Sequence, residues 1–186
     1  MLTKIIVLSF IVALSAAQRS YPTFRQCDLR WRLDIMGASS RNMCDAGCFI
    51  TCISMILNYC GISINGGTAN PRSFNNWLSN NRGYVGGNQF VWDSVDRIGL
   101  DYIGQVSNAR DIRYYFNNDY SVILNVRNGA HFVLMTGATA TGYNAIDPRS
   151  LNSFYSNTDV TRAFIYGSYD CHPFLKSNFI ADEALT

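Results

Sequence analysis

The chain has few charged residues and no long run of them. Only 15% of its 186 residues are Asp, Glu, Lys or Arg, and the formal net charge is +2. No basic stripe of the kind that binds nucleic acid is present, and no acidic tail. The sequence also contains no glycine-rich phosphate loop, no internal repeat and no Asn-x-Ser/Thr sequon for N-glycosylation. We therefore expect neither nucleic-acid binding nor long-range attraction of a ligand by bulk charge.

Long apolar runs are confined to the N-terminus. Residues 1–17 contain Lys4, the run IIVLSFIVAL and a small-residue stretch, which together are typical of a cleaved signal peptide. The run is too short to span a bilayer, and no later run is long enough, so we expect no membrane anchor. The sequence predicts a secreted protein, or one in the endolysosomal or vesicular lumen. Residues 18–186 are long enough for one domain with its own core.

Apolar periodicity and cap residues predict helices in the first part of this domain. The expected helices cover 48–60, 71–81, 89–98 and 109–116. The first of them stops at Gly61, and the second starts after Asn70, an N-cap residue.

The second part of the domain has the composition of β-strands. A strand DYIGQV is expected between the last two helices, and further strands in YSVILNV, HFVLMTGAT and GYNAIDP. Asn128-Gly129 and Thr141-Gly142 are typical of hairpin turns. Helices followed by a mainly antiparallel sheet predict an α+β domain of two packed layers.

Six cysteines suggest a disulfide framework in an oxidising compartment, with up to three bridges. They are Cys27, Cys44, Cys48, Cys52, Cys60 and Cys171. Cys48 and Cys52 lie one helical turn apart and are able in principle to bond to each other, whereas Cys52 and Cys60 are about 12 Å apart along one helix and cannot. If one cysteine stays free, the other five allow at most two bridges, and the pattern leaves their connectivity open. Without a C-x-x-C pair, we expect no metal site.

Histidine is scarce, which narrows the possible chemistry. Only His131 and His172 are available to accept a proton near neutral pH. Cys48 follows a glycine at the start of the first helix, where a thiolate is stabilised, and Asp147 ends the strand that returns from His131. His131 lies about ten residues before the Thr141-Gly142 turn and Asp147 about five after it, so their pairing requires a bulge or staggered strand ends.

The order of these motifs resembles that of a known family. The segments concerned lie in the range 26–148 and are QCDLRW, GCFITCISMILNYCG, PRSFNNWLSNNRGYVGGN followed by VW, GAHFVLMTG and YNAIDP. In order and spacing they resemble papain-like cysteine peptidases, in the branch similar to the bacteriocin-processing (double-glycine) peptidases.

The resemblance implies a papain-like α+β fold and a role for each matching residue. Cys48 matches the nucleophile, His131 the general base and acid, and Asp147 the residue that orients His131. Gln26 matches the glutamine that helps to bind the oxyanion, together with the backbone N–H of Cys48. Such enzymes often have that glutamine six residues before the cysteine, where this chain has Asn42. The resemblance implies no metal and no organic cofactor.

The expected substrate is a peptide or protein, cleaved at an amide bond. One alternative is a peptidoglycan endopeptidase or amidase that acts on bacterial cell-wall peptides. A second is a catalytically inactive, disulfide-stabilised binding protein on the same scaffold, since a fold does not guarantee chemistry. Both enzymes require a free thiol at Cys48. A binding protein in which Cys48 forms a disulfide has none.

Overall fold

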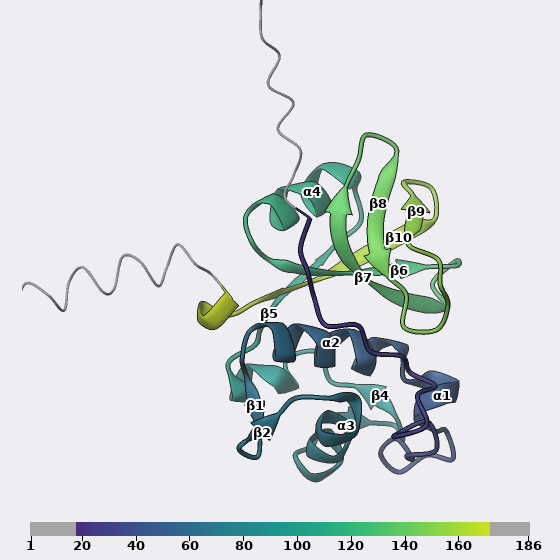
Figure 1. Ribbon diagram of the computed structural model, residues 1–186, viewed down its shortest axis with the longest axis vertical. Coiled ribbons are helices and arrows are strands. Elements are labelled where there is room, and N and C mark those ends of the chain that lie inside the picture. The colour runs from purple at the N-terminus through teal and green to yellow at the C-terminus, as the bar shows by residue number, and fades with distance from the viewer. Residues whose placement is uncertain (1–17, 172–186) are drawn as a thin grey trace, which may run out of the picture.

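The chain folds into a helical layer packed against a six-stranded antiparallel sheet, as expected for an α+β domain (Figure 1). The structure is a computed structural model that describes residues 18–171. The predicted signal peptide, residues 1–17, and His172 lie outside the described residues. None of the helices in the described part is long and apolar enough to cross a membrane.

The helical layer is built from the first half of the described chain. It contains α1 (Met43–Ala46), α2 (Cys48–Tyr59), α3 (Pro71–Asn80), the 3-10 helix η1 (Ser94–Ile98) and two small hairpins, β1 (Ser63–Ile64) with β2 (Gly67–Thr68) and β3 (Tyr84–Val85) with β4 (Gln89–Phe90). Gly61 has a φ of 74°, a left-handed conformation that ends α2 as predicted. The side chain of Asn70 accepts a hydrogen bond from the backbone N–H of Ser73 in a capping box, which starts α3.

The helix predicted over 89–98 is wrong. Its first residues form β4, which pairs with β3 through Tyr84 opposite Phe90. Phe90 contacts Phe49 of α2, with 5.0 Å between the ring centroids. This packing within the core overrides the weak helical spacing, and only η1 remains helical, ending at Gly99 with a φ of 84°.

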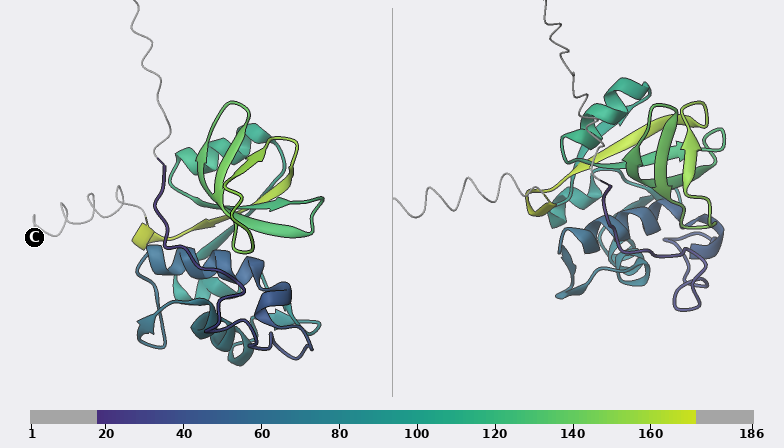
Figure 2. Two further views of the ribbon diagram at one scale, coloured as in Figure 1. Left: turned by 45° about the vertical axis from the view of Figure 1, so that its right-hand side comes forward. Right: turned by 45° about the horizontal axis from the view of Figure 1, so that its top comes forward.

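The sheet is formed by the second half of the chain and carries α4 (Ala109–Asn117) on one face. Its strands, in spatial order, are β5 (Asp101–Val106), β10 (Val160–Gly167), β6 (Ser121–Val126), β7 (His131–Ala138), β8 (Gly142–Ile146) and β9 (Phe154–Ser156), followed in the chain by η2 (Tyr169–Cys171). Every neighbouring pair is antiparallel. The views in Figure 2 show α2 between the sheet and the rest of the helical layer.

Apolar side chains fill both faces of the sheet. The cluster between α2 and the sheet centres on Phe49, whose ring lies 5.0 Å from those of Trp92 and Phe132. A second cluster on the opposite face includes Phe116 of α4 and Leu124 of β6. Because residues 49–57 of α2 are all buried, α2 is packed tightly against β7.

A β-bulge interrupts the β7–β8 hairpin. Pairing starts with Ala138 opposite Tyr143 and later has Leu134 opposite Ile146, so β7 contains one extra residue, Thr136. The carbonyl of Thr136 accepts a hydrogen bond of 2.8 Å from the backbone N–H of Arg19.

The bulge decides which residues share a face of the sheet. The observed pairing ends with Leu134 opposite Ile146. Continued by one residue, this register places Asp147 opposite Val133, two residues from His131. Opposed residues and residues two apart point to the same face. Without the extra residue, His131 and Asp147 would point to opposite faces. The sequence analysis required a bulge or staggered ends for this pairing, and the bulge is present.

Two disulfides tie the ends of the described chain to the helical layer. Cys27 is bonded to Cys44 and Cys60 to Cys171. Cys48 and Cys52 are both free thiols, so they do not form the bridge that their spacing permits. The two disulfides are compatible with an oxidising, extracellular environment.

Candidate active site

Cys48 is the first residue of α2, and it is partly exposed. The residue before it, Gly47, is buried, and a Cβ there would collide with the backbone carbonyl and side chain of Met43 in α1. The glycine therefore lets α1 run directly into α2. The N–H groups of a helix's first turn have no partner inside the helix, and they favour negative charge beside them. Cys48 thus stands in the first turn of α2, beside these N–H groups.

His131 is the first residue of β7, and its imidazole is largely buried, with 4% of the residue exposed. The side-chain N–H₂ of Asn125 donates to the carbonyls of Gly129, at 3.0 Å, and His131, at 3.1 Å. The hydroxyl of Thr161 donates to the Asn125 side-chain oxygen at 3.0 Å. These bonds close the turn between β6 and β7, where Asn128 and Gly129 both have positive φ. They fix the backbone from which the imidazole extends.

The structure brings together the three residues of the predicted triad. His131 Nε2 lies 2.7 Å from Asp147 Oδ1, and Cys48 is close enough to the imidazole to contribute to its pKa. Burial opposes protonation of His131, but the hydrogen bonds and negative charges of Asp147 and Cys48 outweigh it and raise its pKa to about 9. The imidazolium form is therefore favoured at neutral pH. The catalytic roles of the three residues stay a prediction.

Asp147 is fully enclosed by hydrogen-bond donors. Besides His131, its carboxylate accepts bonds from the backbone N–H of Arg149 at 2.7 Å, the Ser150 hydroxyl at 2.5 Å and the Tyr155 hydroxyl at 2.6 Å. Burial alone would raise its pKa, but the bonds from His131, Ser150, Tyr155 and the Arg149 backbone hold it well below its usual range. Asp147 is a permanent carboxylate that fixes the orientation of the imidazole.

Gln26 lies between Asp147 and α1. Its backbone N–H donates to the carbonyl of Pro148 at 2.9 Å, and its side-chain N–H₂ donates to the carbonyl of Cys44 at 2.6 Å. The residue is 1% exposed, and within residues 18–171 its side-chain oxygen has no hydrogen-bond partner. The disulfide from Cys27 to Cys44 fixes the segment next to it. Gln26 is thus held near the start of α2 through Cys44.

Asn42, which occupies the position where the family often has its glutamine, has a different task. Its side chain accepts a hydrogen bond of 3.0 Å from the backbone N–H of Asp45 and caps α1. This bond holds the Asn42 side chain at the N-terminus of α1.

Cys52 is the other free thiol, and its environment differs from that of Cys48. It is 0% exposed, and its S–H points to the carbonyl of Phe132 at 3.8 Å. Burial first, and then the negative charges of Cys48 and Asp147, raise the pKa of its thiol well above the usual value. Cys52 therefore behaves as an apolar core residue.

Sequence reasoning missed the residues that support the triad. Asn125 is a buried polar residue in the otherwise apolar stretch VILNV of β6, a pattern that itself indicates a specific hydrogen-bonding role. Ser150 follows Asp147 at the third position, which is typical of a carboxylate that bonds to its own turn. No local sequence pattern points to Tyr155. Its hydroxyl reaches Asp147 only because β9 pairs with β8 in the folded chain.

Comparison with known proteins supports the fold. A scan against protein-family models finds no match, and a search of curated proteins finds none. Among solved structures, the chain is similar to a double glycine motif protease from an AMS/PCAT transporter, crystallised in complex with the leader peptide. The TM-score is 0.52 at 12% sequence identity, over 82% of this chain and 94% of that chain. Such a likeness shows a shared fold, in agreement with the resemblance noted in the sequence.

Proposed function

We propose that this chain is a papain-like cysteine peptidase that hydrolyses amide bonds through Cys48, His131 and Asp147. The observation that carries the proposal is the position of the His131 imidazole, which lies near Cys48 and 2.7 Å from the buried carboxylate of Asp147. A cysteine at a helix N-terminus, an imidazole and a buried carboxylate in this order are the parts that nucleophilic acyl transfer needs.

The first half of the proposed reaction is acylation. Because Nε2 of His131 is bonded to Asp147, Nδ1 is the nitrogen that exchanges a proton with Cys48. The Cys48 thiolate attacks the carbonyl carbon of the peptide bond and forms a tetrahedral intermediate. The His131 imidazolium then gives its proton to the leaving amine, and the C–N bond breaks to leave a thioester on Cys48.

The second half is hydrolysis of the thioester. His131, now neutral, takes a proton from a water molecule as that water attacks the thioester carbonyl. Collapse of the second tetrahedral intermediate releases the acid product and returns the proton to the Cys48–His131 pair. Asp147 stays ionised throughout and stabilises the imidazolium each time it forms.

We assign the oxyanion to two donors, the backbone N–H of Cys48 and the side-chain N–H₂ of Gln26. One Gln26 N–H is used by the Cys44 carbonyl, and an amide has a second. Loss of one such donor costs about 10²- to 10³-fold in kcat in comparable sites. Gln26→Ala is therefore expected to lower kcat by that order while KM changes little.

The proposed substrate is a peptide, or a peptide segment of a protein, that is found outside the cell or in the endolysosomal lumen. The protease with the similar fold was crystallised with a leader peptide, which supports an extended peptide as ligand here as well. We propose that residues 18–186 form the mature domain after removal of residues 1–17. Cleavage of bacterial cell-wall peptides is the alternative that the test below includes.

The test is hydrolysis of a peptide library by residues 18–186. Cys48→Ala is expected to abolish turnover, whereas Cys52→Ala, which changes a buried thiol one turn away, is the matched control and is expected to retain it. Purified sacculi, assayed for released muropeptides, show whether cell-wall peptides are the substrate. Equal turnover by the wild type and Cys48→Ala would contradict the proposal.

A further inference from the structure

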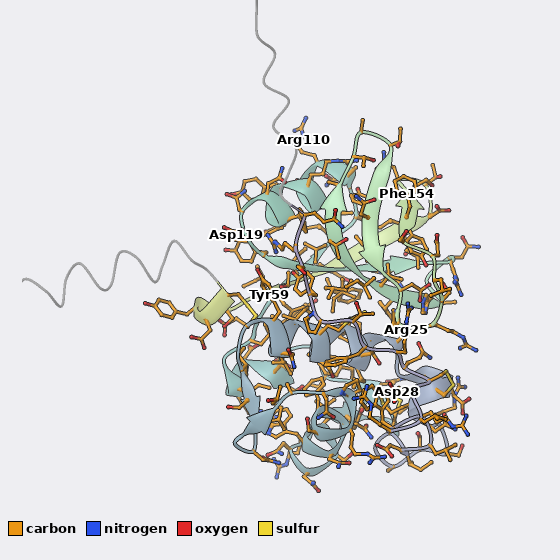
Figure 3. All side chains as sticks on the ribbon, viewed as in Figure 1. Arg25, Asp28, Tyr59, Arg110, Asp119 and Phe154 are labelled. Atoms are coloured by element: carbon orange, nitrogen blue, oxygen red, sulfur yellow. A yellow bond between two sulfur atoms is a disulfide. The ribbon has the colours of Figure 1, made fainter. Side chains whose placement is uncertain are left out.

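A hollow lies beside the candidate site, on the side of Asp147. Its volume is about 510 Å³, and it is lined by Arg25, Cys27, Asp28, Leu29, Pro148 and Arg149. Pro148 directly follows Asp147, and Cys27 is bonded to Cys44 just before α2. Figure 3 shows Arg25 and Asp28 at the end of the molecule where α1 meets the sheet layer. The hollow is therefore lined by the direct sequence neighbours of Gln26 and Asp147, namely Cys27 and Pro148.

The hollow carries positive charge that no carboxylate of the described chain neutralises. The side chain of Arg149 is exposed and makes no hydrogen bond or ion pair within residues 18–171. The guanidinium of Arg25 donates to the backbone carbonyls of Asp147, at 2.6 Å, and Ser150, which bear no net charge. Two cations thus line one small hollow, free to meet an anion from outside.

The carboxylate of Asp28 does not neutralise these cations, because it already forms an ion pair with Arg30. Arg30 donates from Nε and Nη2 to the two carboxylate oxygens of Asp28, at 2.9 and 2.8 Å. Side-chain and backbone hydrogen bonds from Arg30 lower the pKa of Asp28 to about 2. The Asp28–Arg30 pair is neutral as a unit, so the net charge of the hollow is that of Arg25 and Arg149.

One apolar side chain also lines the hollow. It belongs to Leu29, which is 80% exposed. An isolated exposed leucine needs no explanation. Beside the guanidinium groups of Arg25 and Arg149, however, it forms a surface suited to a peptide that carries a carboxylate next to an apolar residue.

The chemistry indicates which part of a substrate would reach this surface. The general acid His131 must contact the departing amine, so the segment C-terminal to the scissile bond leaves the site on the side of His131 and Asp147. Pro148 and Arg149, the two residues after Asp147, line the hollow. We propose that Arg149 and Arg25 bind an acidic side chain of the substrate in the segment C-terminal to the scissile bond. This inference rests on the proposed peptidase function and adds a substrate preference to it.

The test compares paired peptides that differ by one Glu or Gln C-terminal to the cleaved bond. The wild type is expected to prefer the Glu peptide by about three- to fivefold in kcat/KM, the range of an exposed ion pair. Arg149→Gln is expected to bring the ratio to about one, and higher salt is expected to reduce it. Arg110→Gln is the matched control, because Arg110 lies on α4, far from Arg25 (Figure 3), and it should leave the ratio unchanged.

Binding of the same peptides to Cys48→Ala, measured by fluorescence anisotropy, separates the two proposals. A Glu preference in binding that Arg149→Gln removes, without turnover by the wild type, contradicts the peptidase but supports the subsite. Turnover with equal use of Glu and Gln peptides contradicts the subsite alone. Binding of the protein to anionic vesicles that depends on Arg149, with no Glu preference, would assign the hollow to a lipid surface and also overturn the inference.

Discussion

His131 Nε2 and Asp147 Oδ1 lie 2.7 Å apart, across 16 positions of sequence. The contact depends on two local features, the turn that Asn125 closes and the bulge at Thr136, which puts both side chains on one face. It orients the imidazole and keeps a negative charge behind it. The first prediction tests this relationship directly.

Asp147→Asn is expected to lower kcat by about 10²- to 10⁴-fold, because an amide holds the imidazole in the wrong tautomer. It also turns N–H donors toward the hydroxyls of Ser150 and Tyr155, so the free energy of unfolding should fall by about 1–3 kcal/mol. Tyr155→Phe is the matched control, since it removes one donor and leaves the carboxylate. It should lose stability but keep most of its activity. Urea unfolding and kcat on one peptide measure both; equal kcat for the two variants would contradict the role of Asp147.

The raised pKa of His131 predicts how stability depends on pH. The folded state binds this proton more tightly than the unfolded state, whose histidine has the ordinary value of 6.5. The resulting stabilisation is complete below pH 6.5 and is lost as the pH rises through about 9. The difference in unfolding free energy between the wild type and His131→Gln should therefore shrink over that interval. A constant difference would show that the pKa of His131 is not raised.

Histidine NMR tests the cause of that shift. The chain has two histidines, so the spectrum is simple to assign. Cys48→Ala removes one of the two side chains that raise the pKa of His131, and the titration of His131 should move to lower pH. The titration of His172 is the internal reference and should stay in place. An unchanged His131 titration would mean that Cys48 does not interact with it in solution.

Thiol labelling distinguishes the two free cysteines. Iodoacetamide at about pH 8, near the ordinary pKa of a thiol, should modify one thiol in the native protein, the partly exposed Cys48, and two after unfolding without reductant. Cys52 is 0% exposed and should stay unmodified until the fold opens. Native Cys48→Ala should take up no label, and native Cys52→Ala should take up one. Labelling of native Cys48→Ala would show that Cys52 is accessible.

The two disulfides should differ in what their loss affects. Cys27 and Cys44 are 17 residues apart, and Cys60 and Cys171 are 111 apart. Closing loops of such lengths stabilises a fold by about 3 and 4.7 kcal/mol in the chain-entropy account. The double serine variant of Cys60 and Cys171 should therefore lose more stability. The double serine variant of Cys27 and Cys44 should lose more kcat at a temperature where both are folded, because it frees the segment that holds Gln26.

The parts of the fold that sequence predicted are those with local causes. The start of α3 at Asn70 and the end of α2 at Gly61 follow from cap chemistry within a few residues. The candidate site was predicted because the chain has only two histidines, because Cys48 begins a helix and because the order of the motifs resembles that of a known family. These signals lie in the sequence itself, so no tertiary information was needed.

The parts that sequence did not predict depend on contacts between distant segments. No expectation was formed for β10, although it lies between β5 and β6 in the sheet. The pairing of Cys60 with Cys171 likewise follows from where η2 ends, and the wrong helix over 89–98 from the packing of Phe90 on Phe49. Tyr155 reaches Asp147 only because β9 pairs with β8.

The bulge at Thr136 also divides the β7–β8 hairpin into a segment that tolerates changes of length and one that does not. Residues 139–141 form the turn beyond the bulge, so insertions there leave the register near the site intact. A single insertion within 131–135 or 145–147 would reverse the side-chain alternation and separate His131 from Asp147. During divergence of this fold, variation in length is therefore expected to accumulate at the tip of the hairpin, while its base keeps a constant number of residues.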